Sequence, residues 1–550
     1  MLRCIYHVRA FATMCLLFAV VPGARAQRPL PTLILTGGKV FTADSTQPWA
    51  EAIAIRGDRI LAVGTTVDMQ QLAGRTTRRI ELAGRVVIPG INDAHTHLAF
   101  AAPMGAIVGA KGDFIAGPEP AALLDSLAAL ARRTPKGTWL RGDLGMRVIG
   151  DTSVRRAMLD RVTPDHPVAL FAPWGHVTLV NTRGLRAIGF AENARDPLAG
   201  WLERAPGATS PGALTGLLEG YAQWPVWAAL WRTYHTAGKV VPSLQREAAA
   251  AAERGVTSIQ NMSTPFDAQT TASVFRAVRL PQRVRIMPMP ATGPDGRQLE
   301  SWRALPTNLA PTVRRSGMKY VIDGTPIEGN ALQRRAYTYL AHRPHWYGRH
   351  YFPTDTLQAI LRDALNGREP LILHVVGDSA MSVVLGAMEA VAPDSAWGPR
   401  RVRLEHASGL RGADVARAAR KGVIVGQPRD QSPLRSWLAA GVAVAFGTDA
   451  SGEPWRDLMG LVAIPDTAEV ISRERAVQLM TRDAAYAEFA EREKGTLAAG
   501  MLADLAVLSQ DVFTIPAAAL PSTRSVLTLV GGRVVHDMLS SAARRRPSKR

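Results

Sequence analysis

The sequence predicts an α/β protein: a (β/α)8 TIM barrel with a large capping insertion, plus a small β-sandwich domain built from the N- and C-terminal segments. Three observations lead to this prediction. The chain has 550 residues, more than a single hydrophobic core normally organises. Apolar strands alternate with amphipathic helices through its middle part, and short strands with turn residues recur on both sides of that part.

The barrel is expected over residues 90–493. Within it, seven apolar runs end in polar residues and alternate with helical stretches such as 243–255 and 355–368. Continuous apolar strands between helices indicate a parallel sheet covered on both faces. This number of units indicates a closed barrel, in which catalytic residues lie at the carboxyl ends of the strands. The runs occupy residues 255–262, 283–289, 318–324, 370–378, 401–407, 422–428 and 442–450.

The flanking segments, residues 27–89 and 494–540, contain short apolar or alternating runs that are punctuated by Gly or Asp. Such runs are typical of strands joined by tight turns. We expect the two segments to pair into one small antiparallel domain that the barrel interrupts.

The stretch from about 100 to 245 is too long for the barrel units it should contain. Loops at the active face of a barrel tolerate additions, so we expect an insertion that caps the barrel mouth. Its tryptophans either form the core of this cap or line a pocket for an apolar or aromatic group. They are Trp139, Trp174, Trp201, Trp224, Trp227 and Trp231.

Residues 1–26 have the pattern of a signal peptide: Arg3 and Arg9, an apolar run over 11–21, and Ala24-Arg25-Ala26 before the cleavage point. We therefore expect an exported protein without stable membrane insertion, an uncleaved anchor being the alternative. The only cysteines, Cys4 and Cys15, lie inside this segment. Any metal site must then use His, Asp, Glu or Lys.

The formal net charge is +19. The basic residues are mostly scattered arginines, without a stripe interleaved with aromatic residues, so no nucleic-acid partner is expected. A small-molecule substrate is the expected partner, and a homodimer is one option for the assembly. The basic run at 541–550 is predicted to be a disordered tail.

Candidate metal ligands follow the predicted strands. His95 and His97 stand two residues apart, and along a strand such residues point the same way. His374, His406 and Asp449 each end a later apolar run. Taken singly, each has an ordinary alternative, a buried core histidine or a helix N-cap. Their occurrence at successive strand ends favours one metal site.

Several motifs resemble the amidohydrolase superfamily, and within it the amidohydrolase-3 or YtcJ-like branch that includes N-substituted formamide deformylases. The similarity extends over about residues 33–537. The motifs are "VIPGINDAHTHL", "PVALFAPWGHVTLVNTRGLRAIG", "GALTGLLEG", "MKYVIDG", "LILHVVGDSA", "RVRLEHA", "FGTDA" and "KGTLAAGMLADLAVL".

The resemblance implies roles for individual residues. His95, His97, His374 and His406 match the family's metal ligands, and Asp449 matches an aspartate that touches metal and acts as general base. Lys319 aligns with a lysine that is carboxylated to bridge two metals in binuclear members. The alternatives are a Lys319 that pairs with Asp323 or Asp449, and Glu219 as a rival acidic ligand.

Other residues receive supporting roles. His176 and Trp174 are the substrate-binding candidates, with His176 either stabilising the oxyanion or serving a structural turn. Glu405 and Asp378 either orient ligands or are solvated and capping carboxylates. Asp504 is expected to tie the C-terminal strands together.

These predictions describe a hydrolase of amides or N-acyl amines that uses a divalent metal, zinc or a similar ion, with one ion bound or two. The metal supplies hydroxide and Asp449 moves the proton. Hydrolysis of a cyclic amide or an ester, deamination, and a non-catalytic metal-binding barrel are the alternatives.

Overall fold

The computed structural model describes residues 30–98, 106–108, 115–205, 213–262, 264–290, 297–340, 342–367, 369–428, 432–449 and 451–540. The expected signal peptide at 1–26 and basic tail at 541–550 lie outside these residues. Among the helices of the described part, none has the length and apolarity required to cross a membrane.

Two five-stranded sheets form the centre of the molecule, and all their neighbouring strands run parallel except β17 and β18. The parallel α/β architecture predicted from the sequence is therefore present. The first sheet has the order β17 (Asn308–Ala310), β18 (Val313–Arg315), β16 (Arg283–Met287), β15 (Val256–Met262), β8 (Ile91–Thr96). The second has the order β19 (Met318–Val321), β20 (Leu371–Val375), β21 (Arg403–His406), β22 (Ile424–Gly426), β23 (Ala443–Ala445).

Backbone hydrogen bonds join the two central sheets at both margins. On one side, Lys319 N donates to Pro288 O at 2.8 Å. On the other, Ala94 N donates to Phe446 O at 3.3 Å and Asp449 N to His95 O at 2.6 Å. The ends of β8 and of the segment after β23 therefore lie side by side, although about 350 residues separate them in the chain.

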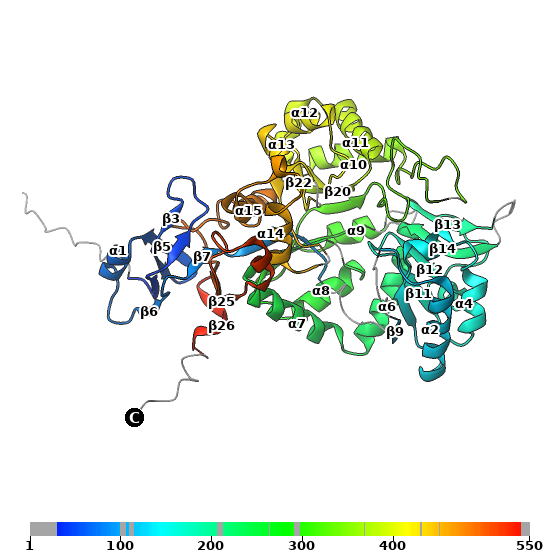
Figure 1. The fold of residues 1–550 in the computed structure, drawn as a ribbon, viewed down its shortest axis with the longest axis horizontal. Coiled ribbons are helices and arrows are strands. Elements are labelled where there is room, and N and C mark those ends of the chain that lie inside the picture. Colours follow the sequence, from blue (N-terminus) through cyan, green and yellow to red (C-terminus); the bar gives the residue numbers. More distant parts are fainter. Residues whose placement is uncertain are drawn as a thin grey trace, which may run out of the picture.

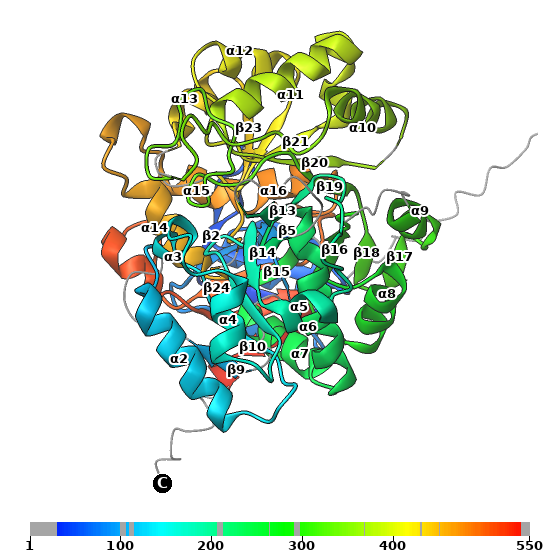
Figure 2. The ribbon, with the colours of Figure 1, turned by 90° about the vertical axis from the view of Figure 1, so that its right-hand side faces the viewer.

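Helices cover the outside of the central strands (Figure 2). Each turns its apolar stripe inward, as Leu357 and Leu361 of α10 show, because residues four apart share one helix face. α8 starts where the Asp267 side chain accepts Thr270 N at 2.8 Å, a normal N-cap. The helices are α7 (Val240–Glu253), α8 (Ala268–Ala277), α9 (Arg297–Ala304), α10 (Thr354–Asn366), α11 (Asp378–Val391), α12 (Ala413–Arg420), α13 (Leu434–Ala439), α14 (Pro454–Val462), α15 (Arg473–Leu479) and α16 (Arg482–Ala487).

The segment that the sequence assigns to an insertion contains a sheet of its own, on the right in Figure 1. Its strand order is β13 (Gly200–Arg204), β14 (Leu214–Gly220), β12 (Val177–Val180), β11 (Val168–Phe171), β10 (Leu140–Asp143), β9 (Ala106–Val108). The helices of this segment are α2 (Pro120–Arg133), α3 (Met146–Gly150), α4 (Arg156–Val162), α5 (Thr182–Ala187) and α6 (Trp224–Thr236).

The two chain ends form two further sheets, on the left in Figure 1, that share one apolar core including Leu35, Ile53, Val87, Leu505 and Leu527. One sheet has the order β5 (Arg59–Gly64), β4 (Ala52–Arg56), β1 (Leu33–Thr36), β6 (Arg78–Glu81), and α1 (Thr66–Gln71) follows β5. The other has the order β26 (Arg533–Asp537), β25 (Ser525–Val530), β24 (Leu505–Leu508), β7 (Val86–Pro89), β2 (Lys39–Phe41), β3 (Trp49–Ala50).

The predicted purely antiparallel pairing of these end segments is wrong. β1 runs parallel to β6, and β2 runs parallel to β7. Parallel strands need a long connection between them. The connections from β1 to β6 and from β2 to β7 are long enough, because β4, β5 and α1 lie within them.

Candidate metal centre and pocket

His95 and His97 stand at the end of β8, where the strand leaves the sheet. His95 is fully buried, and the two rings lie 5.4 Å apart between centroids. His97 Nε2 is 3.3 Å from Asp449 Oδ1, and His95 Nε2 is 3.7 Å from the same oxygen. The two histidines therefore face one carboxylate, as expected for residues i and i+2 of a strand.

Asp449 reaches this centre from the segment that follows β23. Its backbone has a φ of +52°. This left-handed conformation is adopted by Asp and Asn more often than by other L residues, and it often occurs at functional sites. The preceding residue is held by Asp93, which accepts Thr448 N at 2.9 Å and Thr448 Oγ1 at 2.6 Å. This clamp, which sequence reasoning missed, positions the Asp449 carboxylate.

His374, the last residue but one of β20, and His406, the last residue of β21, complete the cluster. The His406 ring lies 4.6 Å from the ring of His374 and 5.1 Å from that of His95. Donor atoms of His95, His406 and Asp449 all lie within 4.8 Å of one another. Imidazole nitrogens with a carboxylate oxygen are ligands that suit zinc and similar divalent ions, so the donor set fits such an ion.

Lys319, on β19, belongs to the same cluster. Its Nζ lies 3.3 Å from His95 Nε2, and burial lowers the pKa of Lys319 to about 8. The predicted alternative partner Asp323 is engaged elsewhere, since its carboxylate accepts the backbone N–H groups of Val376, Gly377 and Leu332. Lys319 therefore faces the histidines and not Asp323.

Glu405 is fully buried and contacts His95 of the cluster. Its Oε2 lies 2.5 Å from His95 Nδ1, so it contacts His95 and not its chain neighbour His406. Burial would by itself raise the pKa of Glu405, but Arg403 and His95 lower it to about 2. Burial also lowers the pKa of His95 to about 4, with a contribution from Lys319. A carboxylate in this position fixes the ring orientation of a ligand histidine.

Two further supporting residues are visible only in the structure. Gln427, directly after β22, places its Oε1 2.5 Å from His406 Nδ1. Arg403 donates to Glu405 Oε1 at 2.9 Å, to Gln260 Oε1 at 2.5 Å and to Ala94 O at 2.8 Å. Both occur within predicted strand-end motifs, which is the one signal that the sequence offers for them.

Two predicted carboxylates do not reach the centre. Asp378 accepts the backbone N–H of Arg334 at 2.8 Å and so orients that segment instead of His374. Glu219, on β14, forms ion pairs with Arg343 at 2.8 Å and Arg349 at 3.1 Å. The roles of Asp378 in orienting a ligand and of Glu219 as a rival ligand are therefore wrong.

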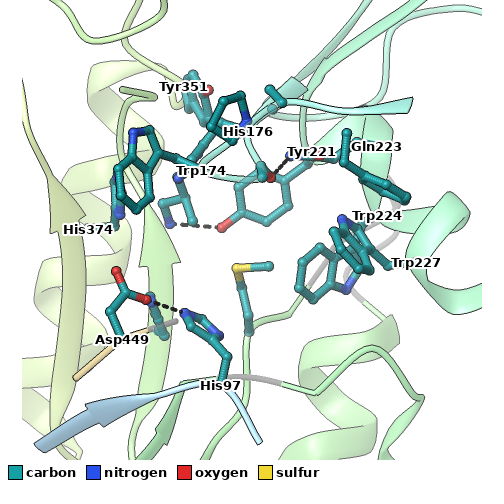
Figure 3. Close-up of a pocket in the computed structure, with 18 of the residues that line it drawn as sticks. His97, Trp174, His176, Tyr221, Gln223, Trp224, Trp227, Tyr351, His374 and Asp449 are labelled. Atoms are coloured by element: carbon teal, nitrogen blue, oxygen red, sulfur yellow. Dashed lines mark hydrogen bonds and ion pairs between the residues drawn. The ribbon is translucent and has the colours of Figure 1, made fainter. Parts of the chain in front are cut away.

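A pocket of about 310 Å³ opens over the cluster. Figure 3 shows His97, His374 and Asp449 on one side of it and Trp224 and Trp227 on the other. The predicted substrate-binding residues Trp174 and His176 line the pocket, and the His176 ring lies 4.5 Å from the His374 ring. Trp231, by contrast, is fully buried, so the tryptophans divide between pocket and core.

The arrangement combines a metal-type donor set with a small, partly aromatic cavity, as in metal-dependent hydrolases. A family model described as "Amidohydrolase family" matches residues 78–536. The chain belongs to this family, as its motifs predicted. It is an enzyme that hydrolyses carbon–nitrogen bonds other than peptide bonds.

Three relatives match over nearly their whole length. Protein LONG AFTER FAR-RED 3 of Arabidopsis thaliana is 26% identical, over 92% of this chain and 91% of the relative. Putative amidohydrolase YtcJ of Bacillus subtilis is 25% identical, over 91% of this chain and 98% of the relative. N-substituted formamide deformylase of Arthrobacter pascens is 25% identical, over 92% of this chain and 99% of the relative.

Two solved structures share the fold. An uncharacterized metal-dependent hydrolase from Pyrococcus furiosus has a TM-score of 0.62 at 20% identity, over 88% of this chain and 100% of that chain. An uncharacterized metal-dependent hydrolase from Pyrococcus horikoshii has a TM-score of 0.63 at 17% identity, over 88% of this chain and 99% of that chain.

Proposed function

We propose that this enzyme hydrolyses a small amide or N-acyl amine with the help of a bound divalent ion, zinc or a similar metal. The observation that carries the proposal is the convergence of the donor atoms of His95, His406 and Asp449 within 4.8 Å, with His406 and Asp449 lining the pocket. When bound, the ion would bring the pKa of water towards neutrality and polarise the carbonyl of the substrate.

Asp449 is the proposed general base. Burial would by itself raise its pKa, but His95, His97 and His406 hold the pKa of Asp449 well below its usual range. The carboxylate is therefore ionised at neutral pH and can take a proton from attacking water. The same group would then pass the proton to the leaving nitrogen. His176, whose ring lies 4.5 Å from that of His374, is the proposed donor to the developing oxyanion.

Lys319 decides the number of ions in this proposal. Its pKa of about 8 leaves roughly a tenth of the amine neutral at pH 7, and the neutral amine is the form that reacts with carbon dioxide. A carboxylated Lys319 would add an oxygen ligand beside His95 and allow two ions. An unmodified Lys319 would leave one.

The fold proposed around this site is a closed barrel of β8, β15, β16 and β19 to β23, capped by the 100–245 insertion. The hydrogen bonds at both sheet margins support the closure. The two end sheets with their shared core support a β-sandwich domain. Export of the protein follows from the N-terminal sequence pattern and is likewise a proposal.

The test measures metal content and hydrolysis together. Purified protein is analysed by elemental mass spectrometry and assayed, before and after chelation and reloading, on a panel of N-acyl amines. His406→Ala should lose the metal and the activity, because it removes one of three close donors. The control His235→Ala, an exposed histidine of α6, should keep both. Protein that purifies without metal and cannot be activated by zinc, manganese or cobalt would contradict the proposal.

A further inference from the structure

Arg141 lies in the pocket without a partner of opposite charge at contact distance. It stands on β10 of the inserted sheet, and its side chain lines the cavity together with the metal-site residues. Its guanidinium packs over the rings of Phe171 at 5.3 Å and Trp227 at 5.6 Å. Within the part of the chain that the structure describes, the guanidinium makes neither a hydrogen bond nor an ion pair, and Asp143 acts on it only as a nearby charge.

Other buried or half-buried arginines of the insertion and of the segment after β19 differ from Arg141 in this respect. Each has a carboxylate within ion-pair distance, which is the usual arrangement for a cation removed from water. The pairs are Arg155 with Glu203, Arg343 with Glu219, and Arg349 with Glu219. The donors of Arg141 are thus directed into a cavity, where a ligand rather than the protein can satisfy them.

The charge of Arg141 is maintained although the site is partly desolvated. Burial lowers the pKa of Arg141, and the nearby Asp143 partly opposes this change. Arginine has so high an ordinary pKa that it remains protonated at any physiological pH. Its stacking on two aromatic rings holds the planar group in place.

Arg141 also lies away from the metal cluster. It contacts Trp227, which Figure 3 shows across the cavity from His374 and Asp449. A substrate whose scissile carbonyl is at the cluster would therefore direct its other end towards Arg141. The cavity of about 310 Å³ is at the small end of the range for small-molecule sites. A compact substrate would therefore contact the metal cluster with one end and Arg141 with the other.

We propose that Arg141 is a specificity-determining residue that binds a carboxylate on the substrate, so that the substrate class is a small amide carrying a carboxylate away from the scissile bond. The inference rests on the proposed function. A guanidinium fork matches a planar carboxylate with two parallel hydrogen bonds. The formal net charge of +19 would favour the approach of such an anion.

The first test compares a matched pair of amides, 5-acetamidopentanoate, which carries its carboxylate at the end of the chain away from the scissile amide, and N-butylacetamide, which lacks only the carboxylate. Metal-loaded wild-type enzyme should show a higher kcat/KM for the carboxylated amide, by about ten- to a hundredfold, mostly through KM. Arg141→Met should bring the ratio close to one, and Arg141→Lys should give an intermediate ratio. Arg133→Met, an exposed arginine of α2, is the control and should keep the wild-type ratio.

The outcomes separate the two proposals. Equal rates on both amides, or an unchanged ratio in Arg141→Met, would overturn the carboxylate assignment while leaving amide hydrolysis intact. Absence of hydrolysis of either amide, and of the wider panel, would contradict the proposed function instead.

A binding measurement tests Arg141 without turnover. Phenylacetate, a carboxylate of fitting size, is titrated into metal-loaded wild type and Arg141→Met by calorimetry. We expect the Kd to rise about ten- to a hundredfold in the variant. An unchanged Kd would mean that the carboxylate binds the metal cluster instead, and would overturn the inference.

Discussion

At the scale of single residues, the contact between Glu405 and His95 has the clearest consequence. The carboxylate is fully buried, lies 2.5 Å from His95 Nδ1 and is shared with Arg403. It thereby sets which nitrogen of His95 faces Asp449 and Lys319. Gln427 holds His406 in a similar way, so two ligand rings are each oriented by an oxygen acceptor.

Glu405→Gln should weaken metal binding by about 10- to 100-fold. Glutamine keeps the size of the side chain but removes the charge that faces His95 and Arg403. The apparent metal affinity can be measured by competition with a chromophoric chelator. Glu253→Gln, at the exposed end of α7, is the matched control, and equal affinities for the two variants would rule out the orienting role.

At the scale of elements, the segment after β19 connects the inserted sheet to the barrel strands. Arg343 and Arg349 of this segment pair with Glu219 of β14, and Arg349 stacks over Trp201 at 4.2 Å. Nearer its start, Asp323 accepts the N–H groups that directly follow β20. The segment therefore holds the insertion over the strand that carries His374.

Asp323 makes this connection pH-dependent. Burial raises the pKa of Asp323 to about 7, although three backbone N–H groups oppose the rise. Between about pH 4 and pH 7 the folded state then binds more protons at this residue than the unfolded state, so its contribution to stability falls as the pH rises through that range.

Asp323→Asn should therefore be most destabilising relative to wild type near pH 5, with the difference shrinking towards pH 8. Urea unfolding of chelator-treated proteins at pH 5 and pH 8 measures this difference. Asp363→Asn, an exposed aspartate of α10, is the control for the loss of one carboxylate. A difference that stays the same between pH 5 and pH 8 would show that the native carboxyl is already ionised at pH 5, and would contradict this prediction.

At the scale of the whole molecule, Asp504 ties the end sheets to the barrel strands. It accepts Arg283 Nε of β16 at 2.7 Å and Gly531 N at 2.6 Å, and its side chain is only 4% exposed. The expected structural role of Asp504 thus includes a contact with the barrel as well as with the C-terminal strands.

Asp504→Asn should lower the free energy of unfolding by about 1–3 kcal/mol, because a buried arginine contact loses its charged acceptor. Asp511→Asn removes the charge from a more exposed pair with Lys39 and should cost less than about 1 kcal/mol. Thermal unfolding of both variants gives the comparison. Equal losses would mean that the Asp504 contact contributes no more than a surface pair.

Much of the fold could be predicted from local patterns. The strands β15, β16 and β19 to β23 each fall within an apolar run identified in the sequence, because a buried strand needs only a short continuous apolar stretch. The direction of pairing could not be predicted for β1 with β6, since it depends on where a long connection returns the chain.

By itself, the sequence determined the order of strands and helices, the absence of cysteine ligands beyond residue 15, and the candidate ligands at strand ends, because these are properties of neighbouring residues. Only the tertiary structure decided which acceptor contacts which histidine, that Glu219 faces arginines, and that Arg141 faces the pocket. Those contacts join residues up to several hundred positions apart, as Glu405 and His95 are. They depend on the register between strands, which a pattern of neighbouring residues in the sequence does not specify.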